Sequence, residues 1–357
     1  MLTFYHRHAC VVSCTLPTIE FVPRNLPCLL PKTLKWDPWV SGNVHNDLTK
    51  EMTMNRKQFL QLGLSSLFAP TLVGKAMAND APPMVKAPVF PQGKTAIQMI
   101  RNATLRVSIG GVVFLVDPML SKKHAFPGFP LTYNHEQRNP MRDLPMSVED
   151  ILKADAILLT HTHEDHWDEA ARQMVPKAMP IYVNDEKALE TVKKAGFTNV
   201  KVLAPKDHFK GVTIYRVASQ HGPDEFYETA PADWAEMLGT TVGFVLEAPG
   251  TKKVYIAGDT VWQPAVTEAL RSHRPDVVVL NTGAAMSSMM RGSMIMDAQD
   301  FLRAYNEAPF ATIVAVHMDA INHCTLHRSD LRQFRDALKM DAKRALIPED
   351  GELMVFA

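Results

Sequence analysis

The chain has 357 residues, of which 46% are apolar, and it carries 38 basic and 38 acidic side chains. It is therefore long and apolar enough to bury a sizeable core, and a formal net charge of zero gives no basis for nucleic-acid binding. Three of the four cysteines fall within the first 28 residues, which excludes both a disulfide framework and a cysteine zinc site in the body of the chain. Any metal must be held by nitrogen and oxygen atoms.

Residues 1–53 differ from the rest of the chain. They contain most of the cysteines and scattered prolines, and they show no sustained hydrophobic period of 2 or 3.6. We interpret them as an untranslated or disordered extension, with translation starting at Met52 or Met54.

Residues 54–78 have the pattern of an export signal. Arg56 and Lys57 form a basic start, residues 59–73 a short apolar run, and residues 76–78 a small-x-small cleavage site. The run Asn-Arg-Lys-Gln-Phe-Leu resembles a twin-arginine signal with lysine in the second basic place. We therefore expect a periplasmic or secreted protein that begins near Asn79. An uncleaved anchoring helix is the alternative, although the apolar run is short for a bilayer, so no stable membrane insertion is expected after signal removal.

Residues 79–96 are rich in proline and are interpreted as a linker, and the ordered domain is expected over residues 97–357. Its first feature is a hairpin, with strands at residues 104–109 and 112–116 joined by Gly110 and Gly111. Asp117 and Pro118 close the second strand. Residues 119–147 have no periodicity, and loops of this length are usually lids or binding loops, so we expect a substrate-facing wall there.

The densest chemistry in the chain follows a short apolar run at residues 156–160. Residues 161–166 read His-Thr-His-Glu-Asp-His, which places several potential metal ligands directly after a predicted buried strand. On an extended segment His161 and His163 point to the same side, and Asp165 and His166 follow where the chain turns. Histidines also gather in polar cores, but this spacing favours a ligand loop for zinc, or for manganese or iron.

The HTHEDH run is similar to the HxHxDH signature of the metallo-β-lactamase superfamily. The flanking sequence resembles the branch that contains the ascorbate-phosphate lactonases and the N-acylphosphatidylethanolamine phospholipases. The resemblance implies an α/β fold, a four-layer αββα sandwich with one or two divalent metals at one edge. It also implies that the hairpin forms one edge of this sandwich and that Asp117 orients the metal site, although a turn-capping role for Asp117 is equally open.

After the motif, helices and strands alternate as in an α/β protein. Helices are expected at residues 169–174, 186–195, 266–271, 300–307 and 329–339, and strands at 180–183, 200–203, 212–217, 241–246, 253–256, 275–280 and 311–316. The resemblance assigns further ligands to the ends of these strands: His221, Asp259 as a bridge between two metals, and His317. A helix N-cap is the alternative for Asp259.

The resemblance implies that His161, His163 and His221 hold one metal and that Asp165, His166 and His317 hold a second. Asp165 and His323 are the expected catalytic residues, with His323 supporting a ligand or contacting substrate. A metal lowers the pKa of bound water to about 7, so hydrolysis of an ester, lactone or phosphodiester bond is expected. The alternative is a non-catalytic metal-binding periplasmic protein.

The expected partner is a small molecule or a lipid-like substrate, and the oligomeric state is left open. Methionines cluster between residues 286 and 296, where they could form an adaptable wall for an acyl chain, although filling of a core or loop is the more common role of methionine.

Overall fold

The computed structural model describes residues 86–357. The predictions for residues 1–53, for the signal at residues 54–78 and for the first part of the linker fall outside the described residues. Strand β1 begins at Thr95, slightly before the predicted start of the domain.

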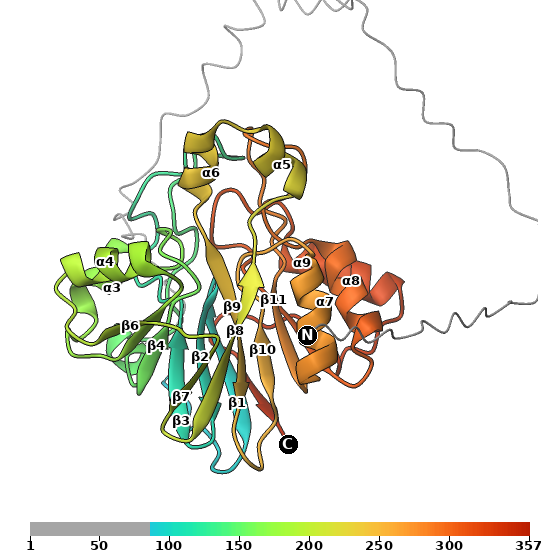
Figure 1. The fold of residues 1–357 in the computed structure, drawn as a ribbon. Helices are drawn as coiled ribbons and strands as arrows, with labels where there is room; N and C mark the ends of the chain where they lie inside the picture. Colours follow the sequence, from blue (N-terminus) through green and yellow to red (C-terminus); the bar gives the residue numbers. More distant parts are fainter. Residues whose placement is uncertain (1–85) are drawn as a thin grey trace, which may run out of the picture. The chain divides into compact units, whose positions relative to one another are not determined.

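Two seven-stranded sheets form the centre of the fold (Figure 1). In the first sheet the order is β14-β1-β2-β3-β4-β5-β6. These strands are β1 (Thr95–Arg101), β2 (Thr104–Ile109), β3 (Val112–Val116), β4 (Ala156–Leu158), β5 (Ile181–Val183), β6 (Val200–Val202) and β14 (Leu353–Phe356). Strands β3, β4, β5 and β6 are parallel to one another. The pairs β14–β1, β1–β2 and β2–β3 are antiparallel.

The second sheet has the order β13-β12-β11-β10-β9-β8-β7. Its strands are β7 (Lys206–Phe209), β8 (Val212–Ser219), β9 (Thr241–Glu247), β10 (Val254–Ile256), β11 (Val277–Asn281), β12 (Thr312–Val316) and β13 (Ala345–Leu346). Strands β10 to β13 are parallel, and β8 runs in the same direction as β10 because each pairs antiparallel with β9.

The helices of residues 86–357 lie on the outer faces of the two sheets or above the ends of the strands (Figure 1). They are α2 (Val148–Ile151), α3 (Glu169–Met174), α4 (Glu186–Lys194), α5 (Asp224–Thr229), α6 (Ala232–Leu238), α7 (Pro264–His273), α8 (Ala298–Glu307) and α9 (Arg328–Ala337). Helices α3 and α4 lie on the first sheet, and α7, α8 and α9 lie on the second. Within residues 86–357 no helix has the length and apolar character needed to span a membrane.

The layers follow from where the apolar side chains point. Alternate residues of both sheets, among them Phe114 and Phe244, pack between the sheets, while Tyr255 and Leu280 face the other way and pack under the outer helices. Strands such as β11 are buried on both faces, which explains their continuous valine and leucine runs. The four-layer αββα sandwich is therefore confirmed.

Most predicted elements are confirmed to within one to three residues, and helix α3 matches its predicted range. The hairpin of β2 and β3 is also confirmed, with its turn at Gly110 and Gly111. Its predicted position at one edge of the sandwich is wrong. Strands β1 and β14 pair on one side of it and β4 pairs on the other, so the hairpin lies inside the sheet. Strands β1, β7, β13 and β14 and helices α2, α5 and α6 were not predicted, and most of them are short segments with weak hydrophobic periodicity.

Candidate metal centre

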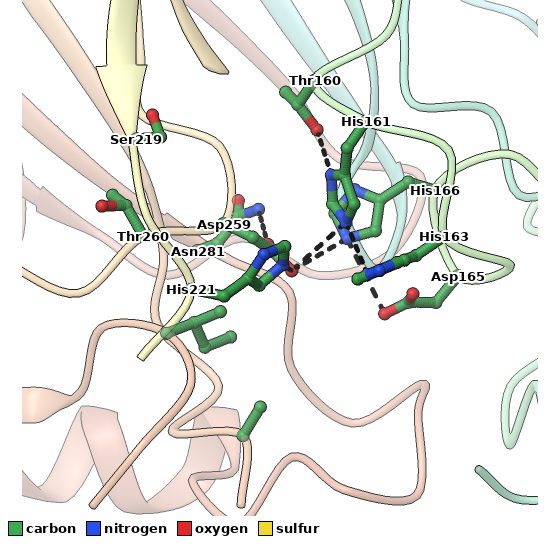
Figure 2. A network of polar contacts seen from close by, with 12 residues as sticks. Thr160, His161, His163, Asp165, His166, Ser219, His221, Asp259, Thr260 and Asn281 are labelled. Atoms are coloured by element: carbon green, nitrogen blue, oxygen red, sulfur yellow. Dashed lines mark hydrogen bonds and ion pairs between the residues drawn. The ribbon is translucent and has the colours of Figure 1, made fainter. Parts of the chain in front are cut away.

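The predicted ligands come from loops that follow β4, β8, β10 and β12. The strands β4, β8, β10 and β12 end at the same side of the sandwich, so the loops that follow them meet there. Hydrogen bonds also join two of the loops: Ser219 Oγ donates to the carbonyl of Ala257 (2.8 Å), and the amide of Gln220 donates to Thr260 Oγ1 (3.1 Å). These bonds fix the His221 loop beside the Asp259 loop (Figure 2).

The loop after β4 turns tightly through the ligand motif. The amides of His166 and Trp167 both donate to the carbonyl of His163, at 2.9 and 2.8 Å. The Trp167 ring is fully buried against Phe197, and Asp168 caps α3 by accepting from the Ala171 amide (2.8 Å). The loop is thereby fixed at its far end by the core and by a helix cap.

The predicted ligands form two groups, within each of which the candidate ligand atoms lie within 4.8 Å of one another. The first group is His161, His163 and His221, and the second group is Asp165, His166, Asp259 and His317. All seven predicted metal ligands are thus brought together (Figure 2 shows six of them).

Ring nitrogens of the first group face one another. His161 Nε2 lies 3.0 Å from His163 Nδ1, and the His161 and His221 ring centroids are 4.8 Å apart. His221 is buried, yet neither of its ring nitrogens has a hydrogen-bond partner among residues 86–357. Buried polar atoms are normally paired, so the two unpaired ring nitrogens of His221 fit the role of a metal ligand.

The second group is more deeply buried. His166 Nε2 lies 3.1 Å from His317 Nε2, and His317 Nε2 lies 3.3 Å from Asp165 Oδ2. His166 and His317 are fully buried. Two imidazoles and two carboxylates converging without solvent match the nitrogen and oxygen donor set of a divalent metal.

Asp259 lies between the two groups. Its Oδ2 is 3.1 Å from His166 Nε2 and 3.4 Å from His221 Nε2, while its Oδ1 accepts from Asn281 Nδ2 (2.6 Å). A carboxylate in this place can contribute to both groups, as a bridge would. The alternative role as a helix cap is wrong, because the N-cap of α7 is Gln263.

Burial and mutual charge shift the pKa values of the cluster in opposite directions. Burial and the neighbouring histidines lower the pKa of His161 well below its usual value, and burial lowers that of His163 to about 4. Burial opposes the charged form of His166 as well, but the carboxylates of Asp259, Asp165 and Asp117 overcome it and raise its pKa to about 10. The cluster therefore contains neutral imidazoles ready to donate electron pairs, beside carboxylates that draw positive charge to the site.

Asp117 is buried and supports the second group directly. Its Oδ2 lies 2.8 Å from His166 Nδ1 and accepts from Thr160 Oγ1 (2.6 Å), while its Oδ1 accepts from the Thr160 amide (2.8 Å). Of the two roles considered for Asp117, this geometry favours orientation of a ligand histidine.

Two supporting residues were missed by sequence reasoning. Asn102, in the turn between β1 and β2, donates through Nδ2 to the carbonyl of Asp165 (3.0 Å), and Cys324 Sγ lies 3.3 Å from His317 Nδ1. Both side chains are buried. A lone asparagine in a turn and a lone cysteine carry no motif, so only the fold reveals their place.

His323, predicted as catalytic, lies beside the second group and against the loop at residues 119–147. Its Nε2 is 3.9 Å from Asp165 Oδ2, and its ring lies 5.4 Å from that of Phe129. Burial lowers the pKa of His323 to about 4, and its Nδ1 has no hydrogen-bond partner in the described chain. The neighbouring Asn322 fixes the loop, since it bonds to Asn139 (2.7 Å) and to the carbonyl of Tyr133 (2.6 Å).

Helices α5 and α6 form a second wall, above the ends of the sheets in Figure 1. The carbonyl of Met237 in α6 lies 3.2 Å from His163 Nε2. A groove of about 520 Å³ runs along these helices and is lined by Trp234, Met289 and Met290 among others. Of the methionines considered as a wall, Met294 and Met296 instead fill the core.

A double-sheet sandwich with this cluster at one end defines the class as metallo-β-lactamase-fold metal-dependent hydrolases. The chain belongs to this superfamily, because residues 113–318 match the model of the "Beta-lactamase superfamily domain". It is 37% identical over 261 residues to the UPF0173 protein YddR of Bacillus subtilis, an alignment that covers 73% of this chain and 99% of the relative.

Two solved structures are similar over the same share of the chain. One is an isothiocyanate hydrolase from Delia radicum gut bacteria, at 46% identity and a TM-score of 0.70, covering 73% of this chain and 99% of the other. The second, described as a possible metal-dependent hydrolase of Veillonella parvula, is 38% identical with a TM-score of 0.71 and covers 73% and 98%.

Proposed function

We propose that this metal-dependent hydrolase acts on small neutral electrophiles of the isothiocyanate type, which carry an organic substituent on an N=C=S group. The observation that carries the proposal is the paired ligand cluster, with which no lysine or arginine of residues 86–357 forms a hydrogen bond or ion pair. Similarity to an isothiocyanate hydrolase at 46% identity supports the choice of substrate class.

The surroundings of the cluster favour a neutral substrate. In residues 86–357 no lysine or arginine forms a hydrogen bond or ion pair with the seven ligands or with His323. Lys122 and Lys123 are exposed on the loop, and Arg138 is occupied by the carbonyls of His124 and Ala125. Sites that bind phosphodiesters usually place lysine or arginine side chains against the phosphate, so this site suits an uncharged substrate better.

The two ligand groups would hold the divalent metal, with Asp259 placed to serve both. When bound there, such an ion supplies Lewis acidity and a lowered pKa for water. Asp165, a member of the second group, and His323, 3.9 Å from it, would orient water and exchange a proton with the substrate. The Nε2 atom of His323, 3.9 Å from Asp165 Oδ2, is the ring nitrogen nearest the cluster and would form the hydrogen bond to the nitrogen of the reacting group.

The reaction is balanced with one water. Oxygen adds to the central carbon of the isothiocyanate and a proton goes to nitrogen, which gives a thiocarbamic acid. Its C–N bond then breaks, the nitrogen takes the remaining proton, and the products are an amine and carbonyl sulfide. The partly buried methionines and Trp234 beside α5 and α6 offer an apolar surface for the substituent.

The test is a substrate panel with the purified, zinc-loaded protein. Allyl and phenylethyl isothiocyanate should release amine and carbonyl sulfide, and His161→Ala protein should release neither. An aryl ester, a γ-lactone and a phosphodiester belong in the same panel, since the sequence alone favoured those bonds. Turnover of one of these with no turnover of isothiocyanates would overturn the proposed substrate class, and a fully inactive panel would favour a non-catalytic metal-binding protein.

A further inference from the structure

We propose that the two metal positions are unequal, and that the first group is completed only when α6 is docked. The second group would take its ion first and more tightly, because buried side chains hydrogen-bond its ligands and hold them in place. The inference concerns metal binding by the ligands that the proposed function uses. Its test measures metal and not turnover, so its failure would leave the hydrolase proposal standing.

The ligands of the second group are held by residues that continue the central strands. Asp117 directly follows β3 and contacts His166, and Asn281 ends β11 and donates to Asp259. Both supporting residues are buried. Ligand side chains that are held by buried hydrogen bonds lose little conformational freedom when they bind an ion, so the second metal position is organised in advance.

His317 of the second group is fixed in the same way. Its amide donates to the carbonyl of Asn102 (2.9 Å), and its Nδ1 lies 3.3 Å from Cys324 Sγ. Its backbone has a φ of 63°, a left-handed conformation that these contacts must hold in place. The ring therefore has a defined direction before any ion arrives.

In the first group only His161 has such support, since its Nδ1 lies 2.9 Å from Thr160 Oγ1; His163 and His221 lack it. Neither nitrogen of His221 is hydrogen-bonded within residues 86–357. The Nε2 atom of His163, which points away from His161, lies 3.2 Å from the carbonyl of Met237, near the end of α6. That bond sets the tautomer which leaves His163 Nδ1 free to bind a metal. The orientation of His163, one of the three ligands, thus depends on α6, a helix that lies above the ends of the strands.

Helix α6 is itself held by few contacts. It is short, and its N-cap Pro231 forms no side-chain capping bond. The ion pair between Glu236 and Lys187 is highly exposed, so it adds little. Leu238, 5% exposed, packs into a small apolar cluster with Met119 and Phe226, and this contact docks the helix. Because coupling between two sites is reciprocal, an ion at the first group and docking of α6 must stabilise each other.

Titration of the metal-free protein with Zn²⁺, followed by a competing chromophoric chelator, tests the inference. Wild-type protein should bind two ions with affinities that differ at least tenfold. His317→Ala should remove the tighter ion and His221→Ala the weaker one. Leu238→Ala should weaken only the weaker ion, by at least tenfold.

Leu270→Ala is the matched control, because it removes an equally buried leucine from α7, away from α6. It should leave both affinities unchanged. Equal affinities in the wild type, loss of the tighter ion in His221→Ala, or an equal effect of Leu238→Ala on both ions would overturn the inference.

A second measurement needs no variant and so does not depend on folding of Leu238→Ala. Hydrogen exchange of the α6 amides should stay fast with one equivalent of Zn²⁺ and slow at least tenfold with the second. Protection that is complete after the first equivalent, or that never develops, would contradict the coupling.

Discussion

Replacing Asp117 by asparagine should weaken the second metal position while leaving the fold in place. Asparagine tolerates the left-handed φ of 44° at this site and can still accept from the Thr160 amide through its oxygen. Its NH₂ group, however, faces the position where His166 Nδ1 lies 2.8 Å away. Donation to that nitrogen would move the imidazole proton to Nε2, the atom that faces Asp259 and His317.

Loss of such a supporting partner typically reduces metal affinity by about 10- to 100-fold, which corresponds to about 1.4 to 2.7 kcal/mol. Asp117→Ala should in addition leave buried groups of Thr160 and His166 unpaired, at about 1 to 3 kcal/mol each in the free energy of unfolding. Zn²⁺ affinity by chelator competition and stability by urea unfolding separate the two effects.

Asp155→Asn is the control, since Asp155 accepts from the Val113 amide (2.9 Å) at a strand of the same sheet but contacts no ligand. It should leave Zn²⁺ affinity unchanged. An Asp117→Asn protein that unfolds like the wild type and binds both ions with normal affinity would refute the orienting role of Asp117.

Three further changes probe other parts of the site and fold. Asp259→Ala should lower the metal content measured by plasma mass spectrometry and abolish hydrolysis, whereas Lys122→Ala should change substrate affinity at most. A full metal content and normal turnover in Asp259→Ala would show that Asp259 is not part of the metal centre. Asn322→Ala should lower the free energy of unfolding by about 2 to 4 kcal/mol, because the loop at residues 119–147 loses the hydrogen bonds that hold it. For the same reason KM should rise more than kcat falls. Unchanged steady-state kinetics would contradict this role of Asn322. Burial is the main cause that raises the pKa of Asp300 to about 6, and the charge of Asp297 adds to it. The protonated Asp300 side chain therefore contributes stability below about pH 4, and this contribution is lost as the pH rises through 6. Asp300→Asn should therefore unfold at higher urea than the wild type at pH 7.5, by about 1 kcal/mol after allowance for its partial exposure, and show no gain near pH 4.

The sequence indicated which residues the fold brings together because its information is local. His161 and His163 follow a short apolar run, Asp259 follows β10 after two residues, and His317 directly follows β12. Once parallel strands are predicted, their ends must meet at one side of the sheets. The position of each ligand then follows from its place along the chain.

What sequence reasoning missed depends on contacts between distant segments. The support of His163 comes from a backbone carbonyl in α6, which no side-chain pattern can reveal. Asn102 and Cys324 reach the site only through the way their turns pack. The hairpin at residues 104–116 was predicted in the right place along the chain and the wrong place in the sheet, because strand order is decided by pairing with β14 from the other end.

That pairing of β14 with β1 brings the two ends of the domain together, with Thr95 opposite Phe356. The chain can therefore be cut elsewhere and rejoined here. A circular permutant that links Ala357 to Lys94 through a few glycines and opens at Gly250, in an exposed turn between β9 and β10, should keep both sheets and the metal ligands. In such a molecule Asp259 and His317 would be synthesised before the ligand motif after β4 and before His221, so the two blocks of ligands would emerge in exchanged order without a change in the site.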